Sequence, residues 1–176
     1  MYSAINDAKK LKRAADEAYD LHQKSCSHAV WHVMKQYILG REYVMANDLL
    51  THLECNPRWT RTGVGELEKY ANEGVLIVGG LADASTATSN GHVVVVYPGT
   101  AKMAGGYTAT INGKPDIVRA RGPYALVMST SMGSSWPGTM SKGDKTVWDP
   151  WGKDKEFAKV KFWRFDPTLK ELPRVC

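Results

Sequence analysis

The sequence predicts an α+β protein whose N-terminal helices pack on a mostly antiparallel sheet. Apolar residues recur at helical spacing up to about residue 72, and β-branched runs bounded by Gly, Ser, Thr and Asn follow from Val75 onward. Asn112-Gly113 is a tight-turn signal between two such runs. Helices first and strands later is the order of an α+β fold. The 176 residues are expected to form one domain, 1–176, with a substantial core.

Four helices are expected in the first part of the chain. Ser25 is the expected N-cap of the second helix, and Gly40 closes it. Cys26 then begins the apolar stripe of that helix. The expected helices cover 5–23, 26–39, 45–54 and 65–72.

Seven strands are expected after the helices. The strand that begins at His92 has apolar residues on both faces, which indicates a central strand covered on both sides. Residues 129–144 are predicted to form a long polar loop at the rim of a substrate cleft. Trp148 is assigned to the core, whereas Trp136 and Trp151 fit either the core or a stacking rim. The expected strands cover 75–78, 92–97, 107–112, 117–120, 126–129, 146–148 and 160–165.

Charge and hydropathy exclude several classes of protein. The net charge is +5, but Lys and Arg are interleaved with Asp and Glu, so the basic stripe of a nucleic-acid-binding protein is absent. A mildly positive chain suits an anionic surface such as the bacterial cell wall. No apolar run reaches the roughly 20 residues that span a bilayer. Residues 1–23 lack the apolar region of a signal peptide, so action outside the cytosol would require another export route.

The three cysteines, Cys26, Cys55 and Cys176, leave at least one free thiol. They lack the paired spacing of a structural zinc site. In an oxidising compartment Cys55 could pair with Cys176 and leave Cys26 free. A cysteine at a helix start is either a small core residue or a nucleophile whose thiolate the helix dipole stabilises.

His92 is the candidate base for Cys26. If the helix packs on the face of the strand that carries His92, the thiol comes within reach of the imidazole. We then expect a thiolate that reacts well below pH 8. The backbone N–H of Cys26 is the expected oxyanion donor, with a side chain of His22 or Gln23 as an optional second one.

A helix-start cysteine followed several dozen residues later by Gly91-His92 at the start of a Val-rich strand resembles a known superfamily. It is similar to the papain-like bacterial cell-wall amidases and endopeptidases of the NlpC and CHAP types, which include type VI secretion amidase effectors. The resemblance implies a papain-like fold, Cys26 as nucleophile, His92 as general base, and no cofactor. It implies cleavage of a peptide bond in the peptidoglycan stem peptide.

The same resemblance implies a biological setting. The protein would be an interbacterial toxin, delivered by a secretion machine to the periplasm of a target cell. A cognate immunity protein would block the cleft in the producing cell.

A third residue is expected to orient the imidazole of His92. Ser129 is the first choice, on the next core-like strand, and Ser131 is nearby. Asp149, a carboxylate between two tryptophans, is the second choice and Asn112 the third. A backbone carbonyl in this role is also compatible with the sequence.

Other functions compete with this interpretation. The chain could be a non-catalytic binding or immunity-type protein with a structural cysteine, or a cytosolic cysteine hydrolase acting on another amide. Zinc binding is less favoured, because no HExxH motif is present and the helical histidines are expected to lie on a solvated face. The pairs with metal-ligand spacing are His28 with His32, His22 with Cys26, and His52 with Cys55.

Overall fold

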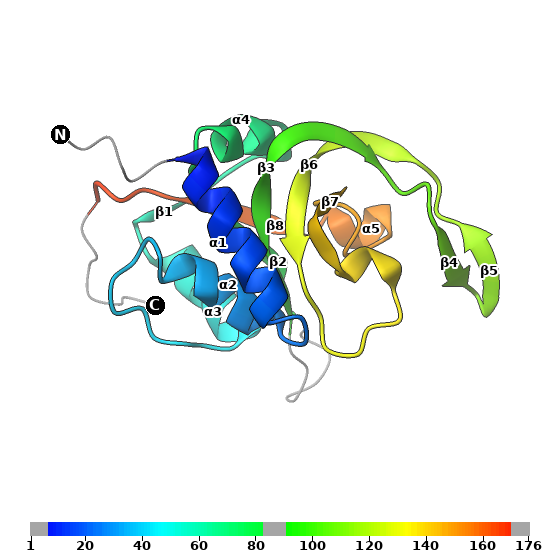
Figure 1. Cartoon of the computed structure of the whole chain (residues 1–176), viewed down its shortest axis with the longest axis horizontal. Helices are drawn as coiled ribbons and strands as arrows, with labels where there is room; N and C mark the ends of the chain where they lie inside the picture. Colours follow the sequence, from blue (N-terminus) through cyan, green and yellow to red (C-terminus); the bar gives the residue numbers. More distant parts are fainter. Residues whose placement is uncertain (1–6, 83–90, 170–176) are drawn as a thin grey trace.

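The computed structural model describes residues 7–82 and 91–169 and contains a six-stranded sheet. Every neighbouring pair in this sheet is antiparallel. Helices and strands occupy similar shares of the chain, so the predicted α+β class with a mostly antiparallel sheet is confirmed (Figure 1). In sheet order the strands are β1 (Trp59–Arg61), β8 (Lys161–Phe165), β2 (Ile77–Leu81), β3 (His92–Ala104), β6 (Arg121–Ser129) and β7 (Ser141–Thr146).

Helices cover both faces of this sheet. Leu11, Val33 and Leu53, one from each of the first three helices, share a buried cluster with alternate residues of β3. The fourth helix packs on the opposite face through Leu67 and Ala71. The helices are α1 (Ala8–Leu21), α2 (Cys26–Met34), α3 (Ala46–Cys55), α4 (Leu67–Asn72) and the short α5 (Asp154–Phe157), and a 3-10 turn, η1 (Val64–Glu66), precedes α4.

Strand β3 is the centre of the fold. Val93, Val94, Val95 and Val96 are all fully buried, which confirms the prediction of a strand covered on both sides. Val93 and Val95 face α1, α2 and α3, whereas Val94 and Val96 face α4. His92 alternates with Val94 and Val96, so α2 does not pack on the His92 face. The condition considered from the sequence, that α2 packs on the His92 face, is therefore not met.

Helix α2 is shorter than predicted. It ends at Met34 and not at residue 39, because the chain tightens after that point. The N–H of Gln36 donates to the carbonyl of Val33, and the N–H of Tyr37 donates to that of Met34, which are three-residue bonds. Gly40 follows with a positive φ of 70°.

The Asn112-Gly113 turn is confirmed. It joins β4 (Thr108–Ile111) and β5 (Lys114–Ile117), and both turn residues have positive φ, 52° and 77°. The two strands form a separate sheet that extends away from the main sheet (Figure 1). The expected strand 117–120 is wrong, because the partner of β4 must begin directly after the two-residue turn.

Sequence also misplaced the end of the polar loop. Residues 141–146 form β7, which pairs with β6, so the loop expected over 129–144 is shorter. Only the ends of β7, Ser141 and Thr146, are buried. An edge strand of this kind carries no apolar alternation, and for that reason its sequence resembles a loop. β1 was not expected either.

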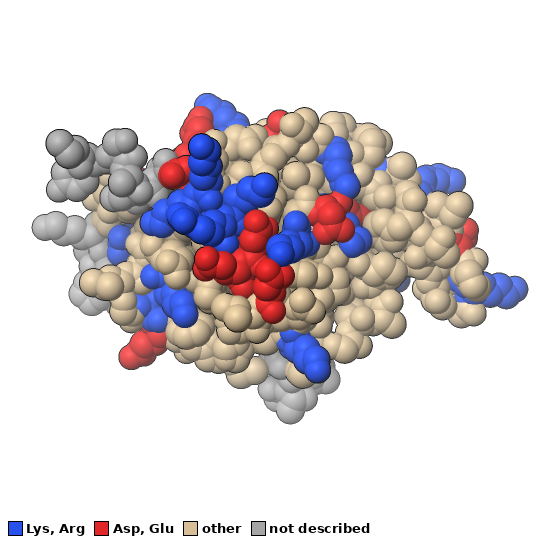
Figure 2. Space-filling model, viewed as in Figure 1, with Lys and Arg blue, Asp and Glu red and all other residues tan. Residues whose placement is uncertain are grey.

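The surface carries both signs of charge side by side. On the face that bears α1, basic and acidic side chains adjoin one another and do not form a stripe of one sign (Figure 2). Lys142 on β7, for example, pairs with Asp20 on α1 at 2.8 Å. Within residues 7–82 and 91–169, no helix is long and apolar enough to cross a membrane.

Candidate active site

A cavity of about 700 Å³ lies where α2 and β3 begin. Segments that are far apart in the sequence form its walls: the start of α2, the segment before α3, the start of β3, and the chain on either side of β7. Cys26 and His92 both line this cavity. So do the residues that contact them or their neighbours, namely Ser27, His28, Tyr43, Gly91, Thr139 and Trp151.

The start of α2 is held by side-chain contacts. Ser25 has an extended backbone, and its hydroxyl accepts the N–H of His28 at 3.3 Å, so the predicted N-cap is confirmed. The Ser27 hydroxyl lies 2.8 Å from that of Tyr43, and the ring of Tyr43 stacks on His28 at 3.9 Å. These contacts hold Cys26 as the first residue of the helix.

The Cys26 thiol is free and lies against the start of β3. It donates a weak, long hydrogen bond to the carbonyl oxygen of Gly91, with the two atoms 3.9 Å apart. Burial raises the pKa of the thiol, while the backbone N–H groups of Val93, Ser27 and Cys26 itself act in the opposite direction. The direction is opposite to the lowered pKa expected from sequence.

His92 is held through one of its two ring nitrogens. Its Nε2 lies 2.9 Å from the Ser129 hydroxyl, which also donates to the carbonyl oxygen of Thr139 at 2.7 Å. A hydroxyl has one proton, and a carbonyl can only accept. Ser129 must therefore accept the bond from His92, so Nε2 carries the proton and Nδ1 carries the basic lone pair.

Burial favours the neutral form of this imidazole. It lowers the pKa of His92 to about 4. The ring of Trp151 lies edge-on to it, with the ring centres 5.5 Å apart. At neutral pH the site therefore holds a protonated thiol and a neutral imidazole.

The structure thus brings Cys26, His92 and Ser129 to one site. The sulfur lies against the backbone of residues on both sides of His92, the carbonyl of Gly91 and the N–H of Val93. The two side chains line one cavity although α2 packs on the opposite face of β3, because each lies at the first residue of its element.

Asp149 does not orient His92, which corrects the second choice for this role. Its Oδ1 accepts bonds from the N–H of Gly105 and the hydroxyl of Tyr107, at 2.9 and 2.8 Å. Its Oδ2 accepts bonds from the N–H and the hydroxyl of Thr146, at 2.8 and 2.9 Å. Each oxygen has two acceptor positions, and these four bonds fill them.

The other candidates have different places. Asn112 lies in the β4–β5 turn and is not an orienting residue. Ser131 lines the cavity, but Ser129 takes the bond from His92. Neither His22 nor Gln23 lines the cavity, so the structure does not support them as oxyanion donors. His22 instead packs its ring near His28, with the ring centres 5.9 Å apart.

The histidine pairs do not assemble a metal centre in the described residues, where no three His, Cys, Asp or Glu side chains group to hold an ion. His32 is buried, with its Nε2 3.5 Å from Glu17, so the expectation that it covers a solvated face is wrong. Cys55 is disulfide-bonded. Cys176, the partner considered from the sequence, lies outside the described residues.

No protein-family model matches the chain, and no curated protein matches its sequence.

Some residues of the site have no sequence signal. Thr139 contributes only its backbone oxygen to Ser129, so its side chain says nothing of the role. Tyr43 contacts the start of α2 from a segment without regular structure. Tyr43 is exposed and lies three residues before the start of α3, outside any helix, so no periodicity points to it.

Proposed function

We propose that this protein is a papain-like cysteine amidase that hydrolyses a peptide bond in the stem peptides of peptidoglycan. One observation carries the chemistry: a free thiol at a helix start and an imidazole with its basic nitrogen left open by Ser129 line the same cavity. The substrate class comes from the resemblance of Cys26 and Gly91-His92 to the cell-wall enzymes. The net charge of +5 suits an anionic cell wall.

In the proposed reaction the Cys26 sulfur attacks the peptide carbonyl carbon while its proton passes to Nδ1 of His92. The C–N bond then breaks, and the leaving amine takes that proton from His92. This leaves a thioester on Cys26. A water molecule that gives a proton to Nδ1 hydrolyses the thioester, releases the carboxylic acid and restores the thiol. The N–H of Cys26 faces the developing oxyanion.

The protonation states support general-base catalysis over a preformed ion pair. Burial raises the pKa of the Cys26 thiol and lowers that of His92 to about 4, so the proton moves as the sulfur attacks. A positioned base of this kind contributes a factor of about 10² to 10⁴ in rate. Ser129 supports this role because it leaves Nδ1, and not Nε2, as the base.

The proposed setting is the periplasm of a target cell, reached through a secretion machine, with an immunity protein that covers the cleft in the producer. The disulfide of Cys55 supports an oxidising compartment, since such bonds are rare where thiols are kept reduced. The same observation argues against a cytosolic cysteine hydrolase.

Digestion of purified peptidoglycan sacculi by wild type and Cys26→Ala tests the proposal. Chromatography of the released fragments should show a single type of peptide bond cut by wild type and none by Cys26→Ala, with unchanged circular-dichroism spectra. Ser131→Ala is the matched control, because Ser131 lines the same cavity without the bond to His92, and it should cut normally.

Two results would contradict the proposal. Continued cutting by Cys26→Ala would show that the nucleophile is another residue. Sacculi left intact by folded wild type would favour the non-catalytic alternative, a binding protein with a structural cysteine.

A further inference from the structure

Gly91 connects the two proposed catalytic residues, because it contacts Cys26 and is adjacent to His92 in the chain. It directly precedes His92, which is the first residue of β3 and pairs with Leu81 at the end of β2. Its carbonyl oxygen accepts the bond from Cys26, and its N–H donates to the side-chain Oδ1 of Asn47 at 3.0 Å. The buried Gly91 N–H therefore has a side-chain acceptor in place of a strand partner.

The fit around Gly91 is tight. A Cβ atom at this position would lie 2.5 Å from Asn47 Oδ1, 2.6 Å from the Leu81 carbonyl oxygen and 2.9 Å from Ala82 Cα. Gly91 does not have a positive φ, so glycine is required here for space and not for backbone conformation. The glycine of the Gly-His motif thus has a physical reason, and Asn47 is part of it.

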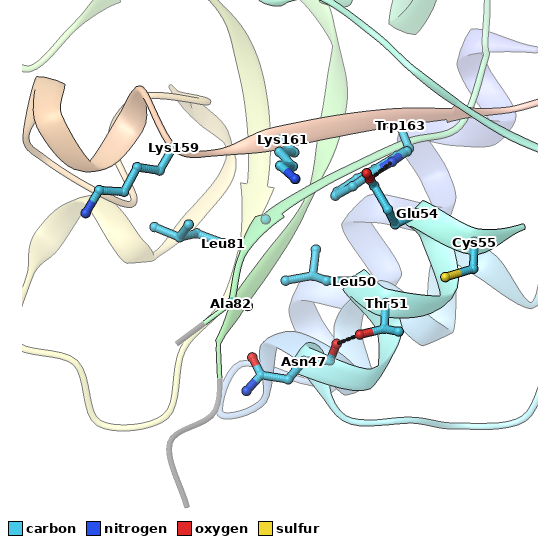
Figure 3. Close-up of a pocket in the computed structure, with 11 residues that line it drawn as sticks. Asn47, Leu50, Thr51, Glu54, Cys55, Leu81, Ala82, Lys159, Lys161 and Trp163 are labelled. Carbon is cyan, nitrogen blue, oxygen red and sulfur yellow. Dashed lines mark hydrogen bonds between the residues drawn. The ribbon is translucent and has the colours of Figure 1, made fainter. Parts of the chain in front are cut away.

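Asn47 reaches this point from α3, outside the candidate cleft. It lines a separate cavity of about 370 Å³ between α3, β2 and β8. In the close-up of that cavity, the side chain of Asn47 extends from the first turn of α3 toward the chain at Ala82, directly after β2 (Figure 3). Asn47 is not among the residues that line the cleft with Cys26 and His92.

We propose that Asn47 is a positioning residue that anchors Gly91, and through it aligns His92 with the Cys26 thiol. This inference rests on the proposed function. The anchor joins α3 to the start of β3 at Gly91, a residue that contacts the nucleophile and adjoins the base. A loose Gly91 would let the imidazole and the sulfur drift apart, and a misplacement of about 1 Å costs roughly a hundredfold in rate.

Three variants test the anchor with soluble muropeptides as substrate. Asn47→Leu keeps the size but removes the acceptor, and should lower kcat about 10- to 100-fold with KM within about twofold. Asn47→Asp keeps an acceptor, in a first helical turn that favours negative charge, and should stay within about threefold of wild type. Thr51→Val is the matched control. It removes a bond to the Asn47 backbone within the same cavity and should leave kcat unchanged.

Hydrogen exchange of the Gly91 amide, followed by NMR, gives a readout that needs no substrate. Exchange should be at least about tenfold faster in Asn47→Leu than in wild type or Asn47→Asp. If wild type cleaves muropeptides and Asn47→Leu has the same kcat, the anchor is not needed and the inference fails while the proposed function stands. If wild type cleaves none, the proposed function fails first, and catalytic positioning fails with it.

Discussion

Two buried polar networks lie close to one another in the sequence and differ in what they leave open. Around Asp149, four donors fill both carboxylate oxygens. Around Ser129, the hydroxyl connects the Thr139 carbonyl to one nitrogen of His92, and the second nitrogen of that ring is left as a base. By chemistry alone, Asp149 would be the better residue to orient His92, because a carboxylate orients an imidazole better than a hydroxyl does.

The saturated Asp149 carboxylate serves the fold, whereas the imidazole of His92, the proposed base, keeps one nitrogen free of the bond to Ser129. Asp149 ties the end of β7 to Gly105 and Tyr107, next to the start of the β4–β5 hairpin. A carboxylate with no remaining acceptor position has nothing to offer His92. The Ser129 hydroxyl, by contrast, bonds the Thr139 carbonyl and the imidazole of His92.

Loss of the base should give the largest effect. His92→Ala removes the acceptor for the thiol proton, so kcat on muropeptides should fall by about 10²- to 10⁴-fold. Measured turnover within tenfold of wild type would mean that another group takes the proton. The free nitrogen of His92 would then have no catalytic role.

Loss of the saturated carboxylate should affect stability instead. Asp149→Ala leaves four donors without their acceptor, which should reduce the free energy of unfolding by about 3 kcal/mol or more. Urea denaturation measures the loss, and turnover per folded molecule should stay near that of wild type. A stable Asp149→Ala protein that has lost activity would place Asp149 in the catalytic machinery and reverse the comparison.

Loss of Ser129 should cost more activity than stability. Ser129→Ala removes the group that keeps the proton on Nε2, so kcat should fall about 10- to 100-fold. Ser141→Ala is a matched control. Ser141 is opposite Ser129 in the register, is fully buried and donates to the Val127 carbonyl, but does not contact His92. Both variants should lose similar stability, and equal losses of activity would contradict a special role for Ser129.

The pH profile sharpens the same contrast. The pKa of His92 is lowered to about 4, so kcat/KM should rise with pH through that value as the imidazole loses its proton and becomes a base. It should fall only where the thiol ionises, and burial raises the pKa of Cys26 above its ordinary value. Alkylation of Cys26 by iodoacetamide should instead become faster as the pH rises through the thiol pKa, because the thiolate is the form that reacts. Rapid alkylation at pH 6 would mean that a thiolate–imidazolium pair exists.

The smallest effect is expected at the hairpin turn. Asn112→Gly places at this position another residue that adopts a positive φ readily. The free energy of unfolding should therefore change by less than about 0.5 kcal/mol, and turnover should not change. Reduced cleavage in this variant would connect the hairpin to the site.

The parts of the fold that sequence predicts well have a dense local signal. Ser25 as N-cap, the valines of β3 and the Asn112-Gly113 turn each follow from a few adjacent residues. Cys26 and His92 belong to this group because each opens an element whose start is marked by a cap or a glycine. The pairing of these two remains a proposal for experiment.

The rest depends on partners that sequence does not display. The face on which α2 packs is set by the whole sheet, and the opposite choice from the expected one still brings Cys26 and His92 to one cavity. The sequence does not show that Asp149 is saturated, because the three residues that supply its four donors are brought to it only by the fold. The two pKa directions follow from burial, which no local pattern reports.

The raised pKa of Cys26 also bears on the lifetime of the protein in air. Peroxides attack thiolates far faster than thiols, and over-oxidation to the sulfinic acid is irreversible for most proteins. In the proposed mechanism the Cys26 sulfur keeps its proton until it attacks, so the thiol should stay reduced in an oxidising medium where the Cys55 disulfide is stable.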